Sequence, residues 1–119
     1  MTPTMTRPWA DIEATYRGRD EVAAMLRLVQ QVRASPYETG LHAWTSMHDL
    51  CIAQAPCPYP YDGPYLRISP RFDGTIEFRY ADTPIKDKQW HRVVNEHDAF
   101  AHLERFMEQV HWIPRRTFA

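Results

Sequence analysis

Apolar and polar residues alternate along two neighbouring segments in the middle of the chain, residues 65–69 and 75–80. A period of two is typical of β-strands, because successive side chains of a strand point to opposite faces of the sheet. Residues 70–74 join the two segments and end in Asp73-Gly74, a turn sequence in which Gly accepts positive φ. The pattern therefore predicts an antiparallel hairpin. Its apolar face carries Leu66, Ile68, Ile76, Phe78 and Tyr80, and its other face carries Tyr65, Arg67, Ser69, Thr75, Glu77 and Arg79.

Three other segments have the spacing of amphipathic helices, with apolar residues three or four positions apart. Residues 8–16 predict a short helix, and residues 20–34 predict a longer one with Asp20 as its N-cap. The third helix follows Asn95, a good capping residue, and stops before Pro114.

Residues 41–54 fit both periods. As one strand they place His42, Trp44 and His48 on the same face. As a helix they place Leu41, Trp44, His48, Cys51 and Ala55 on one side. The apolar run before the proline-rich residues 55–64 favours the strand. Residues 88–94 predict a last strand, in which either Trp90 and Val94 or His91 and Val93 face the core.

The order of these elements is α-α-β-β-β-β-α. Grouped strands with helices outside them indicate an α+β fold. We predict an antiparallel sheet of three to four strands, with the N-terminal helices and the C-terminal helix packed on one face. Residues 1–119 are expected to form a single domain, with frayed tails at about 1–7 and 115–119.

Composition narrows the class of protein. The chain has 119 residues, 44% of them apolar, and a formal net charge of −1, which argues against nucleic-acid binding as a main role. It has no apolar stretch long enough to span a membrane and no secretory signal. Cys51 and Cys57 are expected to be free thiols, so we predict a cytoplasmic protein. We also expect no cofactor.

The leading functional hypothesis is a non-catalytic binding protein, for example an inhibitor or immunity-type protein. The candidate contact residues are Tyr59 and Tyr61 in the proline-rich segment, and Tyr65, Arg67 and Arg79 on the polar face of the hairpin. Tyrosine and arginine are common at protein interfaces. The expected partner is another protein or a second copy, because a small sheet leaves edges and a face to cover.

Two alternatives stay open. His42, His48 and His91, with Cys51, provide the side chains of a metal site or a small enzyme, provided that they converge. The HExxH, G-x-S-x-G and C-x-x-C motifs are absent, so an enzyme is not favoured. The weaker alternative is nucleic-acid binding through Arg67, Arg79 and Arg92.

Overall fold

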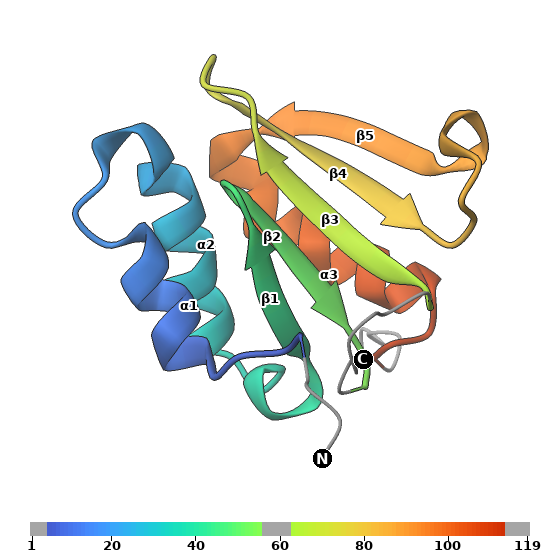
Figure 1. Cartoon of the computed structure of the whole chain (residues 1–119), viewed down its shortest axis with the longest axis horizontal. Coiled ribbons are helices and arrows are strands. Elements are labelled where there is room, and N and C mark those ends of the chain that lie inside the picture. The colour runs from blue at the N-terminus through green and yellow to red at the C-terminus, as the bar shows by residue number, and fades with distance from the viewer. Residues whose placement is uncertain (1–4, 56–62, 114–119) are drawn as a thin grey trace, which may run out of the picture.

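Five strands pair in sequence order to form one antiparallel meander, β1-β2-β3-β4-β5 (Figure 1). The structure is a computed structural model that describes residues 5–55 and 63–113. The strands are β1 (His42–Ser46), β2 (Asp49–Ala53), β3 (Tyr65–Pro70), β4 (Thr75–Ala81) and β5 (Trp90–Asn95). The α-helices are α1 (Trp9–Tyr16), α2 (Ala23–Arg33) and α3 (Ala99–Gln109). Short 3-10 turns are η1 (Asp20–Val22), η2 (Glu38–Gly40), η3 (Lys86–Lys88) and η4 (Glu96–Asp98). The predicted α+β class is confirmed, but the sheet has one strand more than the largest number predicted.

The additional strand comes from residues 41–54, which form a hairpin instead of one strand or a helix. β1 and β2 pair from His42↔Ala53 to Ser46↔Asp49, so only Met47 and His48 form the turn. Met47 has a φ of 57°, a value that normally favours Gly or Asn. The turn therefore lacks its usual sequence signal, which explains why the alternation pattern alone did not reveal it.

The helix termini follow the sequence for α1, which coincides with the predicted short helix, and depart from it at the starts of α2 and α3. Asn95, predicted to cap the last helix, accepts a hydrogen bond of 2.9 Å from the His97 amide and so caps η4, while Asp98 stands at the N-cap position of α3. Asp20, however, lies inside η1 and is not the cap of α2. Val22, the last residue of η1, is the N-cap of α2 and has a non-helical φ of −120° and ψ of 24°.

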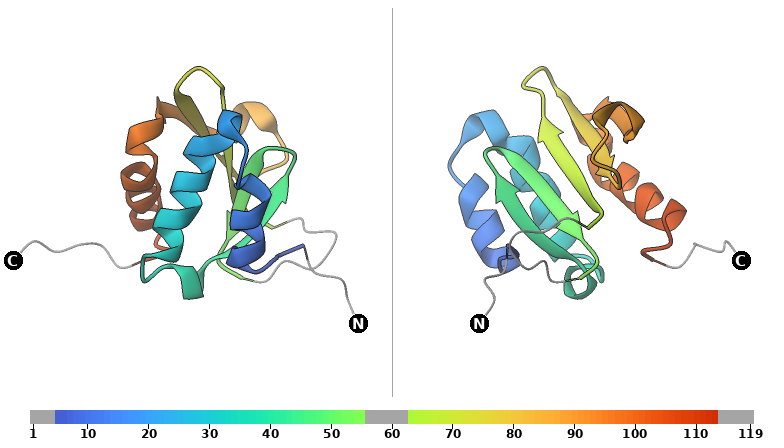
Figure 2. Two further views of the ribbon diagram at one scale, coloured as in Figure 1. Left: turned by 90° about the vertical axis from the view of Figure 1, so that its left-hand side faces the viewer. Right: turned by 45° about the vertical axis from the view of Figure 1, so that its right-hand side comes forward.

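One core lies between the sheet and the helices. Figure 2 shows α2 and α3 on one side of the sheet, with α1 beside β1 at the sheet edge. The strands contribute Leu50, Ile52, Leu66, Ile68, Ile76 and Phe78 to this core, all fully buried. Trp90 and Val94 pack against the same core, which settles the facing of β5 and leaves His91 and Val93 on the other side. No helix in residues 5–55 and 63–113 is long and apolar enough to cross a membrane.

Backbone and charge contacts hold the N-terminal part against β1. The Arg7 amide donates a 2.8 Å hydrogen bond to the Ala43 carbonyl, and Trp9 Nε1 donates one of 3.0 Å to the Leu41 carbonyl. The buried carboxylate of Glu13 pairs with Arg33 of α2 at 3.1 Å. These contacts cover the edge of β1 and fix α1 to α2.

Candidate functional site

The candidate site is the face of the sheet turned away from α2 and α3, which we call the open face. Figure 1 looks directly onto it. Arg67 of β3 and Arg79 of β4 are register partners on this face, as predicted, and Tyr65 lies two residues before Arg67. Tyr59 and Tyr61, the other predicted contact residues, lie outside the described residues.

Charged side chains on the open face form two neighbouring rows across the strands. The register Cys51↔Arg67, Arg67↔Arg79 and Arg79↔His91 defines a basic row. The register Ser69↔Glu77 and Glu77↔Val93 defines an acidic row, which Asp49 extends on β2 because the adjacent Leu50 pairs with Ile68. The basic row thus consists of Arg67 and Arg79, with the uncharged Cys51 at one end and His91 at the other. The acidic row consists of Asp49 and Glu77, with the uncharged Ser69 and Val93 in the same line.

The two rows are joined by ion pairs within the chain. Arg67 Nε lies 2.5 Å from Asp49 Oδ2, whereas Arg79 Nη2 lies 3.4 Å from Glu77 Oε2. His91 Nδ1 lies 3.9 Å from the same Glu77 oxygen. Partial burial lowers the pKa of Arg67, but the hydrogen bond to Asp49 and the smaller contributions of Cys51 and Tyr65 together outweigh it, so the pKa is raised and the guanidinium stays charged. The face is therefore charged but close to electrically balanced.

An aromatic pair lies beside these charges. The rings of Trp44 and Tyr65 have their centroids 5.1 Å apart, and Met5 packs with them against the buried Cys51. A hollow of about 460 Å³ begins at Tyr65. Its lining comprises Gly63, Tyr65, Ala81, Asp82, Thr83, Pro84 and Gln89. The open face therefore combines the partly exposed Tyr65, paired charges and a shallow depression, whereas Trp44 is buried.

The predicted histidine and cysteine cluster does not form. His42 lies on β1 and His91 on β5, the two edges of the sheet, so four strand spacings of about 4.8 Å separate them by about 19 Å. His48 lies in the β1–β2 turn, where its ring meets Phe72 at 5.7 Å between centroids. Cys51 is fully buried on β2. Among the residues that the structure describes, no three His, Cys, Asp or Glu side chains lie close enough to hold a metal ion.

The three arginines of the nucleic-acid hypothesis do not share a face. Arg92 pairs with Phe78 in the register, so it lies on the helix side of β5, where its guanidinium is 5.9 Å from the ring centre of Trp90. Arg67 and Arg79 each have a carboxylate partner. An arginine that is already neutralised gains less from a phosphate, so this arrangement does not favour nucleic acid.

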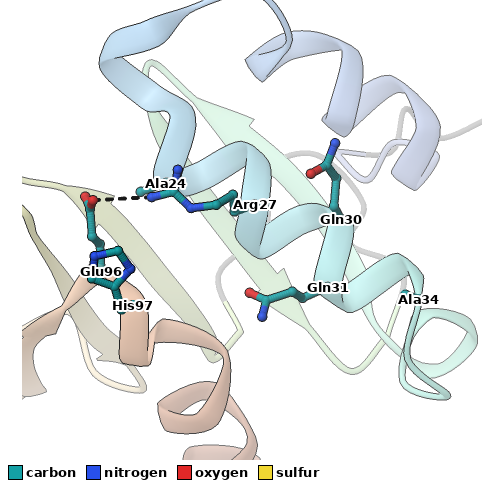
Figure 3. A pocket seen from close by; sticks show the side chains of 7 residues that line it. All are labelled: Ala24, Arg27, Gln30, Gln31, Ala34, Glu96 and His97. Carbon is teal, nitrogen blue, oxygen red and sulfur yellow. Dashed lines mark hydrogen bonds and ion pairs between the residues drawn. The ribbon is translucent and has the colours of Figure 1, made fainter.

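A second hollow lies among the helices, away from the open face. It measures about 400 Å³ and lies between α2 and η4 (Figure 3). Arg27 reaches across it from α2 to Glu96, with 3.3 Å between the paired atoms. The remaining lining residues are Ala24, Gln30, Gln31, Ala34 and His97. It is a polar groove that contains no reactive pair of side chains and suggests no chemistry.

Sequence reasoning missed Asp49 and Trp44 as members of the open face. In a single strand, residues 44 and 51 would lie on opposite faces, whereas the two-residue turn makes Trp44 and Cys51 direct partners on one face. The apolar Leu50 and Ile52 then face the core. A Gly or Asn in the turn would have revealed this grouping, but the turn residues are Met47 and His48.

Comparison with known proteins adds no family or function. No protein-family model matches the chain, and no curated protein or solved structure matches it. The function must therefore be argued from the open face itself.

Proposed function

We propose that this chain is a non-catalytic interaction protein that binds a protein surface through the open face of its sheet. The observation that carries the proposal is the asymmetry of the sheet. One face forms the core with the helices, whereas the other presents Tyr65, Arg67 and Arg79 with their acidic partners. Half-buried arginines and tyrosines on a firm scaffold are typical of contact residues in protein interfaces.

The charge pattern favours a protein over a phosphate-rich partner. Two arginines and two carboxylates lie within the same two rows, so the face offers donors and acceptors together. A protein surface carries both signs and can complement such a mixture, whereas a nucleic acid presents only negative phosphates. The hollow beside Tyr65 offers room for one side chain of a partner.

A charge-reversal experiment tests this proposal. Tagged wild-type protein, the R67E/R79E double variant and the control R105E, which changes an exposed arginine of α3, are compared by affinity capture and quantitative mass spectrometry. Like charges placed opposite one another across an interface cost several kcal/mol. We expect the double variant to capture at least about tenfold less of any protein that the wild type and R105E both capture.

Circular dichroism of all three proteins checks that the fold is intact. Equal capture by the wild type and the folded double variant would contradict the role of the open face.

A further inference from the structure

The two rows on the open face are related in a way that suggests a specific partner. Glu77 and Arg79 are two residues apart on β4, so both point from the open face and Phe78 between them points into the core. Glu77 belongs to the acidic row and Arg79 to the basic row. A rotation of 180° about an axis that crosses the strands over Phe78 exchanges the positions of the two rows.

We infer that the partner is a second copy of this chain, docked face to face about this two-fold axis. The inference rests on the proposed function, because it uses the open face as the contact surface. In a two-fold interface the same patch serves both copies and must complement itself. The exchange of an acidic row with a basic row meets that condition.

The rotation specifies the contacts across the interface. Glu77 faces Arg79 of the second copy, and Arg79 faces Glu77 of the second copy, so the central pair is made twice. Arg67 lies over the small Ser69 of the second copy. There it sits between Asp49 and Glu77 of that second copy. At the β5 end, Val93 faces His91 of the second copy. Both arginines of the basic row therefore meet an acidic or small side chain, and His91 meets the apolar Val93.

The side chains have capacity for these new contacts. The Arg79–Glu77 distance of 3.4 Å and the His91–Glu77 distance of 3.9 Å exceed the roughly 2.8 Å of a well-formed charge-assisted hydrogen bond. Arg79 uses one nitrogen in the contact with Glu77, and a guanidinium has five N–H donors. Val93 is 40% exposed, an unusual fraction for an apolar strand residue and one that a partner would reduce.

The size of the face sets the expected strength of the dimer. On β1 and β2 the open-face side chains Trp44 and Cys51 are already buried, so β3, β4 and β5 provide most of the accessible surface. Three strands about 4.8 Å apart and about 20 Å long cover roughly 300 Å² per copy, which is less than the roughly 800 Å² per partner of standard stable interfaces. The dimer is therefore expected to be weak and reversible. Because exposed ion pairs contribute to it, added salt should weaken it further.

Two single charge reversals test the two-fold arrangement directly. Glu77→Arg places two positive charges at the centre of each copy, and Arg79→Glu places two negative charges there. Each variant should repel its own copy and dissociate at least about tenfold more readily than the wild type. An equal mixture of the two should associate again, because every central position then faces its opposite. Sedimentation velocity over a concentration series gives all three dissociation constants.

The swap variant E77R/R79E serves as the matched control, because it carries both charges in exchanged positions and should form a homodimer like the wild type. If circular dichroism shows that a single variant does not fold, the association of the swap variant is the test of the two-fold axis. Retained association supports the axis, and loss of association overturns it.

A wild-type protein that remains monomeric at all concentrations, or a mixture no tighter than the single variants, would overturn the inference. The proposed function would fail separately, through equal capture by the wild type and R67E/R79E. A monomeric wild type whose captured partner is lost in R67E/R79E would refute the homodimer and leave the interaction role standing.

Discussion

His102 offers the sharpest test of how the helix side of the sheet is stabilised. Its ring stacks on Trp90, with centroids 5.9 Å apart, and meets the edge of Phe78 at 4.8 Å. Nε2 is buried without a hydrogen-bond partner in the described structure. Burial, with the positive charges of Arg105 and Arg92, lowers the pKa of His102. This residue therefore contributes ring contacts but carries an unsatisfied polar atom.

We predict that His102→Phe stabilises the protein. A buried polar atom without a partner costs about 1–3 kcal/mol, and Phe removes that cost while keeping the contacts with Trp90 and Phe78. Fitting the slightly larger ring costs up to about 1 kcal/mol. The net gain should be about 1 kcal/mol, or a rise of about 4 °C in Tm for a chain of this size.

The pH dependence gives the same prediction an independent readout. Because the pKa of His102 is lowered on folding, the unfolded chain takes up a proton at this position more readily than the folded chain. The wild type therefore loses stability as the pH falls below about 6.5, the ordinary pKa of histidine. H102F lacks this loss. The difference in free energy of unfolding between H102F and the wild type should therefore grow as the pH falls from about 7 to about 5.5.

Urea unfolding followed by tryptophan fluorescence at both pH values measures the two effects. The control is His97→Phe, an exposed position on η4, which should change the free energy of unfolding at pH 7 by less than about 0.5 kcal/mol. A destabilised H102F, or an advantage that shrinks as the pH falls, would refute the account of His102.

Four further changes test contacts elsewhere in the fold. Met47→Gly should raise the free energy of unfolding by about 1 kcal/mol, measured by urea titration, because Met47 holds a φ of 57°. Glu13→Gln should lower Tm by an amount equivalent to about 1–2 kcal/mol, because its carboxylate is only 11% exposed and pairs with Arg33. Arg17→Gln, which alters a 64% exposed partner of the same carboxylate, should cost less than about 0.5 kcal/mol in that assay. Tyr16→Phe should lower the free energy of unfolding by about 1 kcal/mol in chemical denaturation, because it removes the hydroxyl that donates a 3.0 Å hydrogen bond to the His48 carbonyl in the β1–β2 turn.

The sequence predicted the fold best where the local signals agreed. Around Asp73-Gly74 the alternation and the turn residues indicate the same hairpin, and the structure has it with the predicted faces. In residues 41–54 the alternation was not accompanied by a Gly, Asn or Pro at the turn. Met47 adopts the left-handed backbone through the pairing of β1 with β2, which is tertiary information that a local pattern does not contain.

The candidate site was predicted in part for the same reason. Tyr65, Arg67 and Arg79 share a face because they lie on one hairpin, and its period of two places them there. Asp49, the partner of Arg67, comes from a different hairpin and depends on the misread turn. His42 and His91 shared no local element, and the order of the strands places them at opposite edges.

The meander has a consequence for how the chain folds. Each strand pairs with its neighbour in sequence, so the sheet can assemble one hairpin at a time from local contacts. The β1–β2 and β3–β4 turns close short loops, whereas joining β2 to β3 closes the longer connection between Ala53 and Tyr65. Each doubling of loop length adds about 0.6 kcal/mol to the entropic cost of closing the loop. We expect β3 and β4 to pair early and the β1–β2 hairpin to join later. Mutations of Ile68 or Phe78 should then slow folding, whereas mutations of Ala43 should mainly speed unfolding in stopped-flow experiments.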